Sequence, residues 1–226
     1  MEERKLALIA LLLVGLAPTV SIFISFGTDG GIISQIAYFI SKFWLFAIPL
    51  IWYLKVDRGK LSFSKPKQGG YAMAIGLGLG MSSLIFGAWF VLGGLIDGDL
   101  LKDAVEPVGL LDVRLYIGGV IYWTVLNSLL EEYVFRWFIT TKSAEIFDSE
   151  MTGIIFSALM FTLHHAIALH LFGFVWWQTV LASFGLISAA IIWSWLYIKY
   201  RSIWVCWLSH AICDVAVFGI GYIILF

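Results

Sequence analysis

Ionisable side chains occur inside stretches of this chain that are otherwise almost entirely apolar. A charged group at the centre of a membrane helix costs about 2.5–3.5 kcal/mol on insertion scales, so such residues are rare without a function. With their neutral polar companions, they are Lys42, Asn127, Glu131, Glu132, Arg136, His164, His165, Gln178, His210 and Asp214. Apart from Lys42 and Gln178, they fall on three apolar stretches, which carry the candidates for chemistry.

The first of these stretches contains two adjacent acids, Glu131 and Glu132. Glu132 precedes Arg136 by four residues, which is the favourable order for an ion pair on a helix. Glu131 is turned about 100° away and shares a face with Asn127, so it has no ionic partner on its own helix. An unpaired carboxylate in a low-dielectric site can exchange protons near neutral pH, as a general base or acid does. A structural cluster of both acids with Arg136 is the competing interpretation.

Histidines occupy the other two stretches. His164 and His165 are adjacent and point about 100° apart on a helix, so we expect one to serve a site and the other to be a bystander. His210 and Asp214 are four residues apart, which allows the carboxylate to orient the imidazole. Each feature alone also suits a buried side chain without function, but the three clusters together favour acid–base chemistry. Lys42 either snorkels to the interface or faces a hydrated cavity.

The composition indicates what kind of elements must position these groups. The 226 residues are 61% hydrophobic and 13% charged, whereas soluble domains contain about 25% charged residues. The chain is therefore typical of an integral membrane protein. The formal net charge of -1 gives no basic field, which excludes nucleic acid as a partner. Cys206 and Cys213 form no CxxC motif and indicate no disulfide framework.

Seven stretches reach the roughly 20 apolar residues that a membrane-spanning helix needs. They are Leu6–Phe26, Ile33–Tyr53, Tyr71–Ile96, Leu115–Ile139, Met151–Leu169, Trp176–Ile198 and Ile203–Phe226. Gly173 and Gly185 could break the sixth, which would give eight helical pieces. The predicted fold class is all-α, a polytopic transmembrane helical bundle forming a single membrane-embedded domain over residues 1–226. The span midpoints put Glu131 and His165 about 13 Å apart in depth, so tilt, unequal helix lengths or a deeper start to the fifth helix must bring them together.

Lysine and arginine are distributed unevenly between the connecting segments. With the N-terminus inside, the outer side carries only Lys102 and Arg114. The inner side carries Arg4, Lys5, Lys55, Arg58, Lys60, Lys65, Lys67, Arg136, Lys142, Lys199 and Arg201. Because cytoplasmic loops carry the excess of positive charge, the N-terminus is predicted to be cytoplasmic, and seven spans put the C-terminus outside. In a prokaryote the membrane would be the plasma membrane.

The order of these residues resembles the three motifs of the CPBP intramembrane protease family, also named Abi or the CAAX protease and bacteriocin-processing family, which includes the type II CAAX prenyl endopeptidase. The motifs are EExxxR at Glu131–Arg136, FxxxH at Phe161–His165, and HxxxN or HxxxD at His210–Asp214. The resemblance covers a motif-bearing core of about residues 115–226. Trp137 replaces the glycine that follows the motif arginine, and His164 is an additional histidine beside the family's position.

The resemblance implies hydrolysis of a peptide bond within the membrane by a glutamate-activated water. It makes Glu131 the general base and lets His165 hold or activate the water. His210 and Asp214 would polarise the scissile carbonyl and stabilise the oxyanion. The expected supporting residues are Glu132, Arg136, Phe161 and Asn127. Independently of the family, no Ser or Cys lies at a convincing spacing from a base, so covalent catalysis lacks a nucleophile.

The resemblance also implies which partners to expect. The expected partners are the lipid bilayer and a membrane-associated or lipidated substrate, such as a prenylated CAAX protein, a bacteriocin or pheromone precursor, or a membrane-anchored regulator. The sequence leaves the question of a metal open: His165, His210 and Glu131 could bind zinc and leave a position for water, although there is no HExxH motif. Two other functions stay open. One is a proton-coupled transporter or channel with Glu131, His165 and Asp214 as a relay, and the other is a non-catalytic membrane scaffold.

Overall fold

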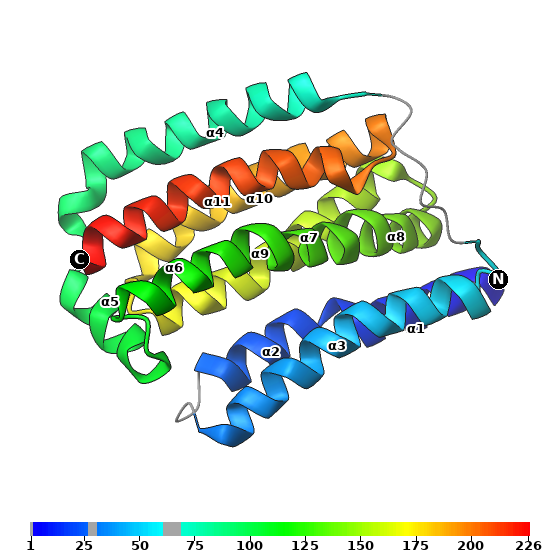
Figure 1. The fold of residues 1–226 in the computed structure, drawn as a ribbon. Helices are drawn as coiled ribbons and strands as arrows, with labels where there is room; N and C mark the ends of the chain where they lie inside the picture. The colour runs from blue at the N-terminus through cyan, green and yellow to red at the C-terminus, as the bar shows by residue number, and fades with distance from the viewer. Residues whose placement is uncertain (1, 27–30, 61–68) are drawn as a thin grey trace.

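The computed structural model describes residues 2–26, 31–60 and 69–226, and the regular elements within these ranges are all helical (Figure 1). Seven helical stretches in the described residues are long and apolar enough to cross a membrane. They are Arg4–Ile24, Ile32–Lys55, Tyr71–Leu95, Val113–Phe147, Glu150–Leu171, Trp176–Tyr200 and Ile203–Leu225. The first helix begins at one end of the bundle and the last helix finishes at the other, as an odd number of crossings requires. The predicted all-α bundle with seven spans is confirmed.

The elements follow one another along the chain with short connections. In order they are α1 (Glu2–Gly15), α2 (Ala17–Phe26), α3 (Ile32–Lys55), α4 (Tyr71–Leu92), η1 (Gly93–Leu95), α5 (Gly98–Val105), η2 (Glu106–Val108), α6 (Val113–Ile121), η3 (Tyr122–Asn127), α7 (Ser128–Glu131), η4 (Glu132–Ile139), α8 (Thr140–Phe147), α9 (Glu150–Leu171), α10 (Trp176–Tyr200) and α11 (Ile203–Leu225). Gly185 lies inside α10, and Gly173, with φ of 85°, lies in the turn before it. The sixth span is therefore a single helix, and the alternative of eight pieces is wrong.

The fourth span is longer than the sequence analysis predicted. Elements α6, η3, α7, η4 and α8 join into one 35-residue helical rod, Val113–Phe147, whereas the prediction ended this span at Ile139. At 1.5 Å per residue the rod is about 50 Å long, which exceeds the hydrocarbon thickness of about 30 Å. Glu131 therefore lies near the middle of the rod instead of near its inner end. Arg136, which was counted with the inner segments, is fully buried within the rod.

Polar side chains along α8 explain why the helix continues past Ile139. The Ser143 hydroxyl donates to the Ile139 carbonyl oxygen, and this contact is fully buried. Lys142 Nζ pairs with Asp57 Oδ2 at 2.8 Å and with Glu145 Oε2 at 3.0 Å. Because these groups satisfy one another, a polar run that reads as a loop is stable as a helix. Of the other inner cations that support the predicted orientation, Lys65 and Lys67 lie outside the described residues.

The helices form two groups around the long rod (Figure 1). On one side α4 runs along α11, and the two approach closely because a Cβ at Gly78 would lie 3.1 Å from the Ser209 carbonyl oxygen. Ser82 Oγ donates to the Ile212 carbonyl oxygen in the same seam at 3.1 Å. On the other side α1, α2 and α3 pack together against the rod and α9. The rod and α9, which carry the first two motifs, lie between these groups, and the third motif is on α11.

Candidate active site

The hairpin of the long rod and α9 brings Glu131 to the depth of the histidines. Glu131 lies 16 residues before the end of α8 at Phe147, and His165 lies 15 residues after the start of α9 at Glu150. Because the two helices run antiparallel from a two-residue turn, these positions meet at the same height. The eight residues of α8 that the prediction left out correspond to about 12 Å, which accounts for the expected depth mismatch.

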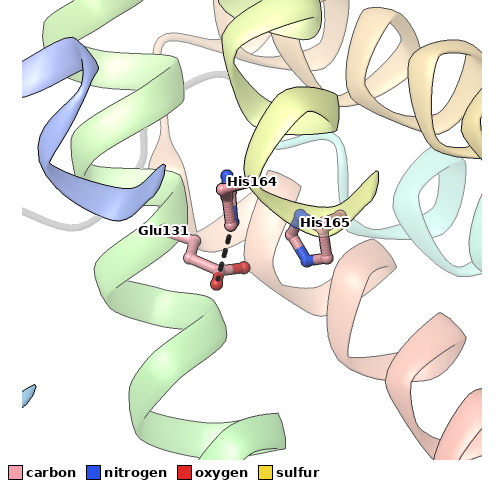
Figure 2. A group of neighbouring side chains, drawn as sticks. All are labelled: Glu131, His164 and His165. Atoms are coloured by element: carbon pink, nitrogen blue, oxygen red, sulfur yellow. Dashed lines mark ion pairs between the residues drawn. The ribbon is translucent and has the colours of Figure 1, made fainter. Parts of the chain in front are cut away.

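The Glu131 carboxylate faces both histidines of α9 (Figure 2). His164 Nε2 is 3.9 Å from Glu131 Oε1, and ligand atoms of Glu131, His164 and His165 all lie within 4.8 Å of one another. Asn127, one turn earlier, donates from Nδ2 to Glu131 Oε1 at 2.8 Å. Both adjacent histidines therefore lie near Glu131, although neighbouring side chains point about 100° apart on a helix. That only one of them serves the site stays a prediction. Their rings lie 4.1 Å apart, and Glu131 is close enough to meet both.

The two histidines differ in their surroundings. His164 is only 4% exposed, and its ring stacks on Phe135 with centroids 5.3 Å apart and an interplanar angle of 13°. His165 is half-buried and lies against Phe161, whose ring centroid is 4.3 Å away. His165 is thus the more accessible of the two. Phe161, the first residue of its motif, is fully buried and its ring contacts both histidine rings.

Glu132 links the long rod to α11. It is fully buried and accepts a hydrogen bond from Arg136 Nε at 3.1 Å, which confirms the predicted ion pair. The Arg136 guanidinium lies against the aromatic faces of Phe161, at 4.7 Å, and Trp193, at 5.5 Å. The second oxygen of Glu132, Oε1, lies 2.8 Å from His210 Nδ1. Because a carboxylate accepts, this contact puts a proton on Nδ1 and directs Nε2 of His210 at Glu131.

The sequence analysis expected Asp214 to orient His210, and the structure places the two side by side, with a shorter contact from Glu132 to the other ring nitrogen. Asp214 Oδ1 is 3.5 Å from His210 Nε2, and Glu131 Oε2 is 3.8 Å from the same atom. The His210 ring also stacks on Trp193, with centroids 4.0 Å apart. Glu131 and Asp214 keep side-chain exposures of 14% and 18%, whereas Glu132 has none. Glu132 is therefore fully buried and ion-paired, whereas the two partly exposed acids, Glu131 and Asp214, face the His210 imidazole.

Two π-helical segments, η3 and η4, flank Glu131 within the rod. Such wide turns are frequent at functional sites, because they shift the register of the side chains that follow. They also free carbonyl groups, and the Phe135 carbonyl oxygen accepts from Thr140 Oγ1 at 2.8 Å and from Ser157 Oγ at 2.7 Å. Because Ser157 belongs to α9, its hydrogen bond to the Phe135 carbonyl oxygen joins α9 to the rod, on the N-terminal side of the histidines.

The donor set at Glu131 also fits a divalent metal. His165 Nδ1 lies 2.9 Å from the Phe161 carbonyl oxygen and His164 Nδ1 lies 3.5 Å from that of Met160. With the Nδ1 protons on these carbonyls, both Nε2 atoms are left unprotonated, which is the arrangement of metal-binding imidazoles. Two histidines and a glutamate are a known ligand set of catalytic zinc. Among the described residues the cluster of ligand atoms consists of Glu131, His164 and His165, and the expected His210 lies beside it, with Nε2 3.8 Å from Glu131 Oε2.

Lys42 contacts the site, although the sequence analysis gave it no role there. It lies on α3, and its Nζ donates to Asn127 Oδ1 at 2.6 Å. The sequence did indicate that Lys42 has a polar contact, because a lysine in an apolar stretch needs a partner. Sequence alone could not name that partner, since Asn127 is 85 residues further along the chain.

Acids and imidazoles gathered among apolar spans define a membrane-embedded protein with a site suited to acid–base hydrolysis. Comparison with known families agrees: residues 113–216 match the sequence model of the family described as type II CAAX prenyl endopeptidase Rce1-like. This match confirms the resemblance to the CPBP family and supports a transmembrane protease of the CAAX type. No curated protein and no solved structure matches the chain.

Proposed function

We propose that this protein is an intramembrane endopeptidase in which Glu131 activates a water molecule for attack on a peptide bond. The observation that carries the proposal is the Glu131 carboxylate, held by Asn127 and surrounded by imidazole nitrogens of three histidines within a bundle of membrane helices. A general base must lie within reach of the water that it deprotonates. The side-chain exposure of 14% at Glu131 supports access for that water.

The residues support a hydrolytic sequence without a covalent enzyme intermediate. Glu131 takes a proton from water while the oxygen attacks the scissile carbonyl carbon, and His165 holds the water. In its doubly protonated form, with Nδ1 held by Glu132 and Nε2 facing Asp214, His210 donates from Nε2 to the developing oxyanion. When the carbon–nitrogen bond breaks, Glu131 returns its proton to the leaving amine. A divalent metal held by Glu131, His164 and His165 would supply a Lewis acid for the same water.

The substrate class in this proposal is a lipidated protein or peptide at the membrane, and a prenylated CAAX sequence is the member of that class that the matched family's description names. The direct test incubates the purified protein in lipid vesicles with a prenylated peptide that ends in a CAAX sequence. A product whose mass corresponds to hydrolysis of one peptide bond supports the proposal. The proposal would be contradicted if the peptide stayed intact and the lipidated proteins in membranes that contain this protein also stayed intact.

Replacement of each adjacent histidine by phenylalanine separates their roles. His165→Phe is expected to lower the cleavage rate by about 10²–10⁴-fold, because it removes a nitrogen that holds the water. His164→Phe keeps the stacking on Phe135 and is expected to retain most of the activity. Rates and bound metal of both purified variants are the measurement. If the wild-type protein binds one zinc per chain and His164→Phe loses both the zinc and the activity, the water would instead be activated by a metal.

The proposed orientation puts the N-terminus in the cytoplasm. Asp103 on α5 and Lys60 after α3 are exposed and lie at opposite ends of the bundle, while both native cysteines are buried. In intact cells, Asp103→Cys is expected to react with a membrane-impermeant maleimide, and Lys60→Cys only after permeabilisation. The reverse pattern would show that the protein is inserted with its N-terminus outside.

A further inference from the structure

Lys42 lies outside the segment that matches the family, yet it reaches the active site. It is on α3, and its Nζ lies 2.6 Å from Oδ1 of Asn127, the last residue of η3. Its charge also lies 5.1 Å from the centroid of the Tyr38 ring, one turn earlier on the same helix. A lysine within a membrane span costs about 2.5–3.5 kcal/mol, so a specific contact of this kind calls for an explanation.

The contact determines which way the Asn127 amide faces. A lysine ammonium has three donors and no acceptor, so it can bind only the amide oxygen. The amide nitrogen then faces the opposite direction, where Nδ2 donates to Glu131 Oε1 at 2.8 Å. The two contacts therefore favour the same orientation of the amide, and without the lysine the amide is held from the Glu131 side alone.

Lys42 is not needed merely to attach α3 to the rod, because other side chains already do so. Tyr133 on the rod donates its hydroxyl to the Phe46 carbonyl oxygen of α3 at 3.0 Å. The hydroxyls of Tyr38 and Tyr122 lie 3.4 Å apart across the same interface. These contacts flank Lys42 on both sides, which leaves the orientation of Asn127 as its distinct effect.

We propose that Lys42 is a positioning residue of the active site, which acts through Asn127 to hold the Glu131 carboxylate toward the imidazoles. The chain Lys42–Asn127–Glu131 runs across two spans by hydrogen bonds of 2.6 and 2.8 Å. Lys42 also supplies a positive charge near Glu131, whereas Arg136 is already paired with the neighbouring acid, Glu132. This inference rests on the proposed function of Glu131, and its experiment therefore includes a measurement that needs no cleavage.

The kinetic arm uses Lys42→Met, Lys42→Arg, Asn127→Ala and the double variant Lys42→Met/Asn127→Ala. Lys42→Met is expected to lower kcat by about 10- to 100-fold with little change in KM, because a misplaced catalytic group slows chemistry more than binding. Lys42→Arg keeps a donor and a charge and is expected to restore most of kcat. The double variant is expected to be no slower than Asn127→Ala alone, because both changes break one chain of contacts.

The matched control is Ser41→Ala, next to Lys42 on α3. Ser41 Oγ contacts the Tyr38 carbonyl oxygen and Ser21 of α2, and none of the active-site residues, so kcat is expected to stay at the wild-type value. A loss in Ser41→Ala equal to that in Lys42→Met would overturn the proposal, as would multiplicative losses in the double variant. Either result would mean that α3 affects the site through its packing alone.

The second arm records the carboxylate band of Glu131 as an infrared difference between each protein and its Glu131→Gln counterpart. The band is expected to shift in Lys42→Met and Asn127→Ala and to return in Lys42→Arg. An unchanged band in Lys42→Met would overturn the positioning role, whatever the protein cleaves. A shifted band in a protein that cleaves no peptide would support the positioning role and contradict the proposed function.

Discussion

Glu131→Gln is expected to lower peptide hydrolysis by about 10²–10⁴-fold, because the amide cannot accept the proton of the attacking water. The substitution keeps the shape of the side chain and leaves an oxygen that can accept from Asn127, so the fold should be preserved. Comparison of the membrane proteomes of cells with wild-type and Glu131→Gln protein is expected to show truncated products that vanish in the variant. The same comparison identifies the substrate.

The matched control for this substitution is Glu150→Gln. Glu150 is an exposed acid at the start of α9 that pairs with Arg201 at 2.8 Å, and its change is expected to leave cleavage unaltered. Full cleavage by Glu131→Gln would remove Glu131 from the role of base. A pH-dependent ion flux altered by the variant, with no cleavage by either protein, would favour the transporter. Unaltered partner binding without cleavage would favour the scaffold.

Arg136→Met is expected to lower the free energy of unfolding by about 3–5 kcal/mol, because it leaves the buried Glu132 carboxylate without its cation. Both side chains of the pair have zero exposure, so water cannot replace the lost partner. The loss is expected to extend to His210, since Glu132 also holds that ring. The measurement is unfolding of the purified protein in detergent, followed by tryptophan fluorescence.

An exposed ion pair provides the control for this prediction. Arg201→Met removes the contact between Arg201 and Glu150, whose side chains are 53% and 58% exposed, and such pairs contribute about 0–1 kcal/mol. Adding Glu132→Gln to Arg136→Met is expected to recover part of the stability, because the two changes are coupled through one contact. Equal effects of Arg136→Met and Arg201→Met would show that burial of the Glu132 pair has no energetic consequence.

The seven spans could be predicted from hydropathy because lipid requires about 20 apolar residues in every crossing helix. The same reasoning failed at the end of the fourth span. Thr140–Phe147 is polar enough to read as a loop, yet it is helical because Lys142 finds Asp57 on the segment that follows α3. A partner from a distant part of the chain is invisible to a local window, and this error alone produced the apparent depth mismatch between Glu131 and His165.

Within the site, contacts along one helix were the predictable ones. The pair of Glu132 and Arg136 follows from a spacing of four residues, and the hydrogen bond from Asn127 to Glu131 has the same spacing. The contacts between helices were not predictable in this way. Glu132 meets His210 across 78 residues, which adds a second carboxylate to the one that the spacing had placed beside this ring.

The sequence by itself determined that the chain is a helical membrane protein and which rare polar residues it places in the spans, since insertion into lipid depends on residue type and local periodicity. The tertiary structure decided which of those residues meet. Antiparallel packing of the rod and α9 sets Glu131 against both His164 and His165, and α3 brings Lys42 to Asn127. The physical reason is that helix length and packing fix depth and rotation, and these depend on contacts between segments that lie far apart along the chain.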